Sequence, residues 1–258
     1  MQYRKVDGYL YETHMHTSEG SACGQNTGAE MAAAYADAGY TGIIVTDHFF
    51  YGNTAVDRTL PWREWVEAFC LGYEHAREEG EKRGLQVLFG WESGYDGTEF
   101  LVYGLDREWL LAHPEIRDAS VEEQFRLVHE GGGMVCHAHP FREASYIHEI
   151  RLFPEYVDAV EGMNAANAEK GMAAKPPCLE YDARAAAYAE EHGFPMTAGS
   201  DQHSTKMLYG GMVFDRKIKD MRDFVRMVMD REAVLLLDGR EGGISHFPGT
   251  HRAGTTAG

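Results

Sequence analysis

Apolar and polar positions along the chain follow two patterns, which together predict strands alternating with helices. Short apolar runs bounded by turn residues predict strands at residues 9–13, 42–46, 85–90, 100–105, 133–136, 157–161 and 195–198. Helical spacing covers residues 27–39, 61–83, 120–131, 179–192 and 220–231, and a last apolar run follows at 233–237. Thr27 with Glu30, and Ser120 with Glu123, have capping-box spacing, which marks the start of two helices.

This order of elements indicates the fold class. Strands that alternate with helices favour a parallel sheet covered by helices. Seven core strand candidates, with no Pro/Gly/Ser-rich linker between them, favour one α/β barrel domain over two separate domains. Residues 241–258 are rich in Gly and Thr, and we expect them to form a loosely held tail.

Composition and charge narrow the function classes. The 258 residues have 44% apolar and 25% charged side chains, as expected for a globular protein. The net charge of −17 disfavours stable binding to duplex nucleic acid, but bound metal ions can still attract a small anionic substrate. No apolar run is long enough to span a membrane, and the N-terminus lacks the apolar stretch of a secretory signal. The four cysteines show no CxxC spacing, so we expect free thiols and a cytoplasmic location; the oligomeric state stays open.

Metal-binding residue types follow the predicted strands. Six of the 13 histidines lie at or just past strand ends, together with three acidic residues. These residues are His14, His16, His48, His137, His139, His203, Asp47, Glu92 and Asp201. In a barrel of βα units such positions converge on one face, where burying them together without a cation would be costly. Imidazole and carboxylate groups suit zinc, manganese and iron, and a bridging carboxylate such as Glu92 can join two ions.

The pair His14 and His16 has a spacing that suits joint ligation. Residues i and i+2 of a strand point to the same face, so both imidazoles can contact one ion. His137 and His139, and likewise Asp201 and His203, have the same spacing.

Five motifs in this order resemble the PHP family (polymerase and histidinol phosphatase) over roughly residues 8–240. They are HMHTSEGS at 14–21, TDH at 46–48, GWES at 90–93, HAHPFR at 137–142 and GSDQH at 199–203. The resemblance implies a distorted, TIM-like (β/α)7 barrel over residues 1–240, and two or three divalent metal ions (Zn, Mn or Fe). It also implies a metal-dependent phosphoesterase, similar to histidinol phosphatases.

The resemblance also implies a ligand set. His14, His16, Glu92 and Asp201 resemble the ligands of the first metal, Glu92 and His139 those of the second, and His48 and His203 those of the third. Many members have an Asp or His soon after the first HxH motif, where this chain offers only Glu19 as a carboxylate. Others have a His just before a strand like FLVYG, where this chain has Glu99. Glu19 and Glu99 are therefore candidate ligands, each weighed against a surface role. Asp47 is expected to orient His48 or its loop.

Other residues are candidates for substrate binding and proton transfer. Arg142 is the best candidate for a phosphate clamp, and Lys206 is a weaker one. Asn164 is expected to position substrate or water, or to serve a local turn. Asp201 or a nearby histidine, of which His137 is one, is the candidate proton donor to the leaving group.

The leading hypothesis is hydrolysis of a phosphomonoester of a small metabolite, such as histidinol phosphate, by metal-activated hydroxide. A nucleotide or oligonucleotide phosphatase of the same family is the first alternative. An amidohydrolase-type C–N hydrolase also begins with HxH, but no Lys closely follows FLVYGL, and Asn164 stands where that fold expects a histidine. A third alternative is a non-catalytic PHP module like those attached to replicative polymerases. In such a module we would expect more of the metal-ligand positions to be substituted than in this chain. We expect a small phosphorylated substrate as the partner and no membrane association.

Overall fold

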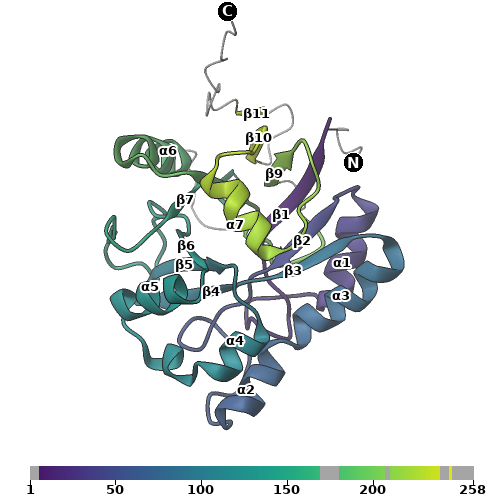
Figure 1. Ribbon diagram of the computed structural model, residues 1–258, viewed down its shortest axis with the longest axis vertical. Coiled ribbons are helices and arrows are strands. Elements are labelled where there is room, and N and C mark those ends of the chain that lie inside the picture. The colour runs from purple at the N-terminus through teal and green to yellow at the C-terminus, as the bar shows by residue number, and fades with distance from the viewer. Residues whose placement is uncertain (1–5, 169–179, 207–209, 239–243, 246–258) are drawn as a thin grey trace, which may run out of the picture.

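The computed structural model describes residues 6–168, 180–206, 210–238 and 244–245, and its strands form two sheets (Figure 1). The first sheet has the order β11–β10–β9–β1–β2–β3, and the second has the order β4–β5–β6–β7–β8. The first contains β1 (Tyr9–Met15), β2 (Gly42–Val45), β3 (Gln86–Phe89), β9 (Gly210–Phe214), β10 (Leu235–Asp238) and β11 (Ile244–Ser245). The second contains β4 (Trp91–Tyr95), β5 (Thr98–Tyr103), β6 (Met134–His137), β7 (Ala159–Asn164) and β8 (Met196–Gly199).

The predicted TIM-like (β/α)7 barrel is wrong. β1, β2 and β3 run parallel, as do β6, β7 and β8. However, β5 is antiparallel to both of its neighbours, β4 and β6, and β9 is antiparallel to β1 and β10. Among the described strands no ladder joins β3 to β4 or β8 to β1, so the sheets do not close into one parallel barrel.

A tight hairpin explains why the parallel order breaks. Asp96 and Gly97 connect β4 to β5 and have positive φ angles of 51° and 83°. A two-residue turn of this kind matches the twist of an antiparallel pair and reverses the chain at once. The sequence pattern missed β4, because its residues WESGY lack the apolar run used to predict strands.

The two sheets are nevertheless linked where β1 and β8 end. The hydroxyl of Thr13 donates to the carbonyl of Ala198 at 2.7 Å. The buried carboxylate of Glu12 accepts the backbone N–H of His14 at 2.9 Å and that of Ser200 at 2.8 Å. Isolated parallel bridges also join Met15 to Gln202 and His48 to Glu92. These links bring the ends of strands from both sheets to one place.

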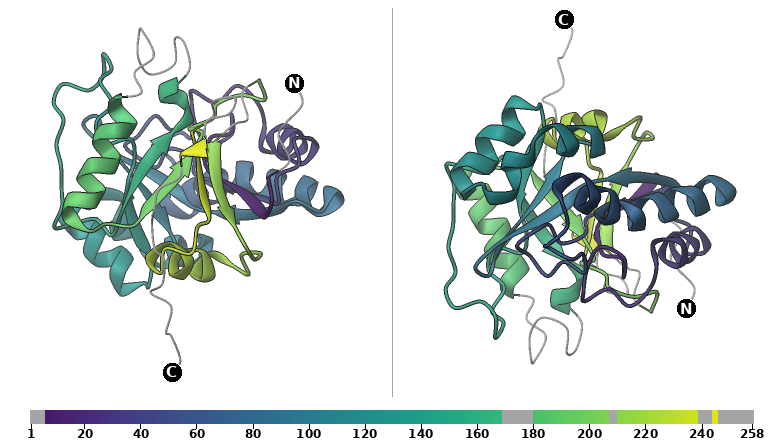
Figure 2. Two further views of the ribbon diagram at one scale, coloured as in Figure 1. Left: turned by 90° about the horizontal axis from the view of Figure 1, so that it is seen from above. Right: turned by 90° about the horizontal axis from the view of Figure 1, so that it is seen from below.

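The helices cover the outer faces of the sheets. They are α1 (Gly28–Asp37), α2 (Trp62–Phe69), α3 (Leu71–Arg83), α4 (Arg107–Ala112), α5 (Val121–Glu130), α6 (Glu180–His192) and α7 (Met221–Met229), with the 3₁₀ turns η1 (Pro114–Asp118) and η2 (Ala165–Ala168). Both predicted capping boxes are present, at the starts of α1 and α5. The single helix predicted over 61–83 is instead two helices that meet at Cys70. α1 and α3 lie side by side beside β2 and β3, and α6 packs on β7 (Figure 2).

Two further findings concern the sequence predictions. Among the described residues, no helix combines the length and apolar character needed to cross a membrane. Of the predicted tail 241–258, all but residues 244–245 lie outside the described residues.

The packing of α7 gives a test of the fold. Phe224 on α7 is fully buried and has edge-to-face contacts with Tyr103 at 5.1 Å and Phe214 at 6.4 Å between ring centroids. We expect Phe224→Ala to lower the free energy of unfolding by about 3–5 kcal/mol, because it leaves a cavity between the two sheets. Urea denaturation followed by circular dichroism measures this loss. The control is Met229→Ala at the end of the same helix, where the side chain is 46% exposed; equal losses in both variants would contradict the packing described here.

Candidate metal centre

Imidazoles and carboxylates from both sheets meet where the strands end. His14 and His16 come from β1 and the residue after it, Glu92 from β4 and Glu99 from β5. His48, His139, Asp201 and His203 lie in the loops that follow β2, β6 and β8. Eight of the nine predicted ligands form groups with atoms within 4.8 Å of one another, namely His14, His16, His48, Glu92, Glu99, His139, Asp201 and His203. The predicted convergence at strand ends therefore holds without a closed barrel.

The carboxylate of Glu92 lies at the middle of this cluster. Its Oε1 atom is 3.2 Å from Nε2 of His139 and 3.3 Å from Nε2 of His14. Its Oε2 atom is 3.0 Å from Nδ1 of His48. Burial raises the pKa of Glu92, but the charges of His14 and His48 outweigh this effect and hold the pKa well below its usual range. Glu92 therefore stays ionised between imidazoles from both sheets.

Asp201 is the second buried carboxylate of the cluster. Its Oδ1 atom is 3.2 Å from Nε2 of His16, and its Oδ2 atom accepts a 2.6 Å hydrogen bond from Arg142. Burial raises its pKa, but Arg142 and His14 hold the pKa well below the usual range. The backbone of Asp201 is left-handed, with a φ of 51°, which is a strained conformation for a residue other than glycine. An aspartate held ionised in this way suits ligation better than proton donation.

Glu161 orients the first histidine, although the sequence analysis gave it no role. Its Oε1 atom accepts a 2.8 Å hydrogen bond from Nδ1 of His14, which leaves Nε2 of His14 facing Glu92. The Oε2 atom of Glu161 accepts from the backbone N–H of His139 and from the amide of Asn164. A carboxylate behind a ligating histidine fixes its tautomer and makes it more basic. Asn164 is fully buried and positions Glu161; it is not among the residues lining the large cavity described below.

His16 and His203 are oriented by other groups. Nδ1 of His16 lies 3.1 Å from the hydroxyl of Ser21, which itself donates to Asp47 at 2.7 Å. The same hydroxyl accepts the backbone N–H of His48 at 2.9 Å, so Asp47 supports this loop, in line with its expected role. Nδ1 of His203 donates to the backbone carbonyl of Asp201 at 2.8 Å.

The residues present fit divalent cations. Nδ1 of His48 and Oε2 of Glu92 are buried and face each other, yet neither has an aligned hydrogen-bond partner among the described residues. Burial, with repulsion from His48 and His203, lowers the pKa of His16 to about 3, so its imidazole is neutral and keeps a lone pair for a metal. Burial lowers the pKa of His14, but Glu161 and Glu92 raise it well above the usual value. A cation would replace the proton that these carboxylates otherwise hold on His14.

Three predicted residues lie outside the cluster. The carboxylate of Glu19 accepts the backbone N–H of Gly28 at the start of α1 and lies 3.0 Å from Nδ1 of His75. The ring of His137 lies 4.9 Å from that of Phe100, and burial lowers its pKa to about 3. Lys206 is exposed and is not among the described residues that line the large cavity. The geometry therefore places Glu19 and Lys206 away from the ligand cluster, whereas His137 lines a smaller pocket together with Glu99 and His139.

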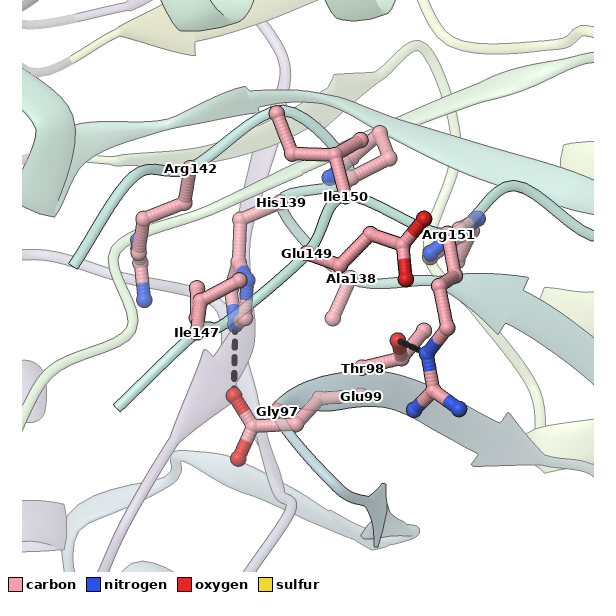
Figure 3. Close-up of a pocket in the computed structure, with 12 residues that line it drawn as sticks. Gly97, Thr98, Glu99, Ala138, His139, Arg142, Ile147, Glu149, Ile150 and Arg151 are labelled. Atoms are coloured by element: carbon pink, nitrogen blue, oxygen red, sulfur yellow. Dashed lines mark hydrogen bonds and ion pairs between the residues drawn. The ribbon is translucent and has the colours of Figure 1, made fainter. Parts of the chain in front are cut away.

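The cluster opens into a cavity of about 610 Å³. Its walls include Glu92, Glu99, His139, Asp201, His203 and Arg142. Figure 3 shows a smaller adjoining pocket that shares Glu99, His139 and Arg142 with this cavity; in it His139 faces Glu99 at 3.4 Å. Burial and the nearby charge of Glu92 raise the pKa of Glu99. A metal ion beside Glu99 would be favoured, because its positive charge would offset the repulsion between the carboxylates of Glu99 and Glu92.

Arg142 and Cys23 complete the polar wall of the cavity. Arg142 is buried; its Nη1 atom donates to Asp201, its Nε atom donates to Asn167 at 3.2 Å, and Tyr146 lies beside the guanidinium. Its Nη2 atom has no aligned partner among the described residues.

Burial raises the pKa of Cys23, but hydrogen bonds with His203 and His48 outweigh this and bring the pKa to about 7. The sequence analysis did not single out Cys23, because a lone cysteine carries no spacing signal.

Comparisons with known proteins agree with this geometry. Residues 181–232 match the model of the PHP-associated family. A two-domain protein from Bacteroides vulgatus, containing a predicted PHP-like metal-dependent phosphoesterase, has a similar fold: the TM-score is 0.64 at 14% identity, covering 92% of this chain and 69% of that one. A protein from Bifidobacterium adolescentis assigned as a metal-dependent phosphoesterase gives 0.50 at 16% identity, covering 86% and 96%.

A third similar structure is an amidohydrolase from Chromobacterium violaceum with bound sulfate and no metal. Its TM-score is 0.50 at 16% identity, covering 75% of this chain and 87% of that one. No curated protein matches the chain significantly. The predicted resemblance to the PHP family is confirmed by the family model over residues 181–232 and by the similar folds, while histidinol-phosphatase-like specificity finds no support in these comparisons.

The contact between Glu161 and His14 gives a test of the metal centre. We expect Glu161→Gln to weaken metal binding by about 10–100-fold, because the amide is a weaker partner for Nδ1 of His14. Competition with a chromophoric chelator measures the affinity. The matched control is Glu190→Gln on α6, where the residue is exposed. Unchanged affinity in Glu161→Gln would show that Glu161 does not support a ligand.

Proposed function

We propose that the protein is a metal-dependent phosphoesterase that hydrolyses a phosphomonoester of a small metabolite. One observation carries the proposal. The cluster of candidate ligands and the buried Arg142, whose Nη2 donor has no aligned partner among the described residues, line the same cavity. The PHP-associated match and the two similar structures assigned as phosphoesterases support the same reaction class.

Divalent ions bound by these residues would polarise a phosphoryl oxygen and lower the pKa of a bound water, so that hydroxide forms near neutral pH. Glu92 is placed to be shared between ions, because His14 and His139 lie beside one of its oxygens and His48 beside the other. Asp201, kept ionised by Arg142, offers a further oxygen beside His16. His14, held by Glu161, presents Nε2 toward the same space.

Arg142 is placed to bind the phosphate. Asp201 and Asn167 hold two of its nitrogens, which fixes the direction of the guanidinium plane. Asn167 is itself held, because its amide donates to Asp182 at 2.7 Å. The remaining Nη2 atom is a buried donor at the wall of the cavity, and a charged donor of this kind binds a phosphoryl oxygen strongly. An amide substrate has no comparable negative charge, so Arg142 favours a phosphoester over a C–N bond.

The substrate is proposed to be small. A cavity of about 610 Å³ accommodates a metabolite or a mononucleotide, and the net charge of −17 repels long polyanions. Histidinol phosphate and nucleotide 3′- or 5′-phosphates are therefore the compounds to compare.

A substrate panel tests the function. Protein loaded with Mn²⁺, Zn²⁺ or Fe²⁺ should release phosphate from monoesters, and chelated protein should not. We expect Glu92→Ala to lower kcat/KM by about 10³-fold or more, because loss of the shared ligand removes several kcal/mol of charge stabilisation. The panel contains p-nitrophenyl phosphate, its bis-ester, histidinol phosphate, nucleotide monophosphates and N-acyl amides. Absence of phosphate release from protein with measured bound metal would reject the proposal, and turnover of amides alone would favour a C–N hydrolase.

Arg142 gives a separate prediction. We expect Arg142→Gln to lower kcat/KM for monoesters by about 10²-fold, because the phosphoryl group loses a preorganised charged donor. Steady-state kinetics measures the effect, and metal content measured on the same sample shows whether Asp201 still binds. Arg184→Gln is the control, since Arg184 is exposed and pairs with Glu143. Equal kinetics in the two variants would remove Arg142 from substrate binding.

A further inference from the structure

One carboxylate of α6, that of Asp182, lies behind the wall of the large cavity. Asp182 is in the first turn of α6 and is not among the described residues that line the cavity. Its Oδ1 atom accepts a 2.7 Å hydrogen bond from the side-chain amide of Asn167 and a 3.3 Å bond from the backbone N–H of Asn164. Asn164 ends β7 and Asn167 lies in η2, so one oxygen atom contacts both ends of this short segment.

Asn167 connects this carboxylate to Arg142. The side chain of Asn167 is buried, and its Oδ1 atom accepts the 3.2 Å hydrogen bond from Nε of Arg142. The orientation of the amide follows from its two neighbours, because a carboxylate needs a donor and a guanidinium needs an acceptor. A reversed amide would face both neighbours with the wrong atom. The link from Asp182 through Asn167 to Arg142 is therefore directional.

The second contact of Asp182 leads toward the metal ligands and is the weaker one. The amide of Asn164 donates to Glu161 at 2.9 Å, and Glu161 orients His14. However, Asp182 meets Asn164 only at the backbone, and β7 also holds Asn164 in register with Gly199 of β8. Asn164 therefore keeps its place in the sheet without Asp182, so loss of Asp182 should act mainly on Asn167.

The two oxygen atoms of Asp182 differ in their surroundings. Oδ1 accepts both hydrogen bonds, whereas Oδ2 is buried and has no aligned partner among the described residues. Burial raises the pKa of Asp182 to about 7, although the hydrogen bonds from Asn167 and Asn164 oppose this effect. An asparagine at this position would keep an oxygen for Asn167 and would remove no described partner of Oδ2.

We propose that Asp182 is a positioning residue for phosphate binding, which acts through Asn167 to set the direction in which Arg142 presents its Nη2 atom. The inference rests on the proposed function, because it requires Arg142 to bind a phosphoryl oxygen. If Asn167 is no longer held, the bond to Asp201 remains at Nη1, and one contact does not fix the plane of a guanidinium. The cavity-facing Nη2 donor would then lose its preorganised position.

Binding of inorganic phosphate to the metal-loaded protein tests the inference. We expect Asp182→Ala to weaken phosphate binding and to raise KM for p-nitrophenyl phosphate by about 10-fold, the effect of one lost hydrogen bond. Calorimetry and steady-state kinetics measure these changes, and metal affinity should stay unchanged. Asp182→Asn should retain wild-type values. Loss of a negative charge alone would strengthen phosphate binding, so the expected weakening cannot come from charge. Glu180→Ala, at an exposed position in the same turn, is the control.

A double-mutant cycle shows whether the effect passes through Arg142. In an Arg142→Gln background, Asp182→Ala should cause no further loss of phosphate binding. The same loss in both backgrounds, or equal losses in Asp182→Asn and Asp182→Ala, would overturn the inference, as would a loss of metal affinity as large as that of phosphate affinity. Wild-type activity with no change in Asp182→Ala rejects this inference alone. Wild-type protein that holds metal but neither binds phosphate nor hydrolyses monoesters rejects the proposed function as well.

Discussion

Charge compensation around the buried carboxylate of Glu92 is the constraint on which the site depends. A buried carboxylate without a partner is strongly destabilising, and Glu92 lies close to Glu99 and Asp201, which carry the same charge. The chain offsets this charge with imidazoles from β1 and from the loops after β2 and β6, and with Arg142 beside Asp201. Because the compensating groups come from both sheets, the charge balance also constrains how the sheets meet.

Local backbone strain and buried hydrogen bonds hold the strand ends of the two sheets together at this site. His139 and Asp201 both have positive φ angles, of 28° and 51°, just after the strands that carry them. These conformations are unfavourable for residues with a Cβ, and neighbouring contacts hold them. Glu161 accepts the N–H of His139, and Arg142 binds the side chain of Asp201. Glu12 performs the corresponding role at β1, where it binds the N–H groups of His14 and Ser200. Two carboxylates that do not line the cavity, Glu12 and Glu161, thus hold the histidines and the backbone segments beside it.

The sequence predicted which side chains meet better than it predicted the architecture. Histidines and acidic residues next to predicted strand ends can be recognised in the sequence, and eight of the nine predicted ligands lie close together in the structure. The two-residue hairpin at Asp96 and Gly97 was missed because β4 lacks an apolar run, and this hairpin breaks the parallel order that a barrel needs. Glu161 was missed because a carboxylate inside an apolar strand gives no sign of which histidine it faces. Glu19 was weighed as a ligand because it is the only carboxylate shortly after the first HxH motif, where members of the resembled family often have an Asp or His. The contact with Gly28 that turns it away depends on the three-dimensional course of the loop.

Carboxylates and imidazoles are distributed unevenly over the cluster. Glu92, Glu99 and Asp201 surround one part, where oxygen atoms and neighbouring imidazoles would suit hard or borderline ions. His16, His48 and His203 form the other part, where nitrogen dominates. His16 and His48 belong to both, because His16 approaches Asp201 while its ring stacks on that of His203, and His48 approaches Glu92 while its ring stacks on that of His16. The charge state of these two shared imidazoles therefore depends on the groups present in either part, so the two parts are electrostatically coupled.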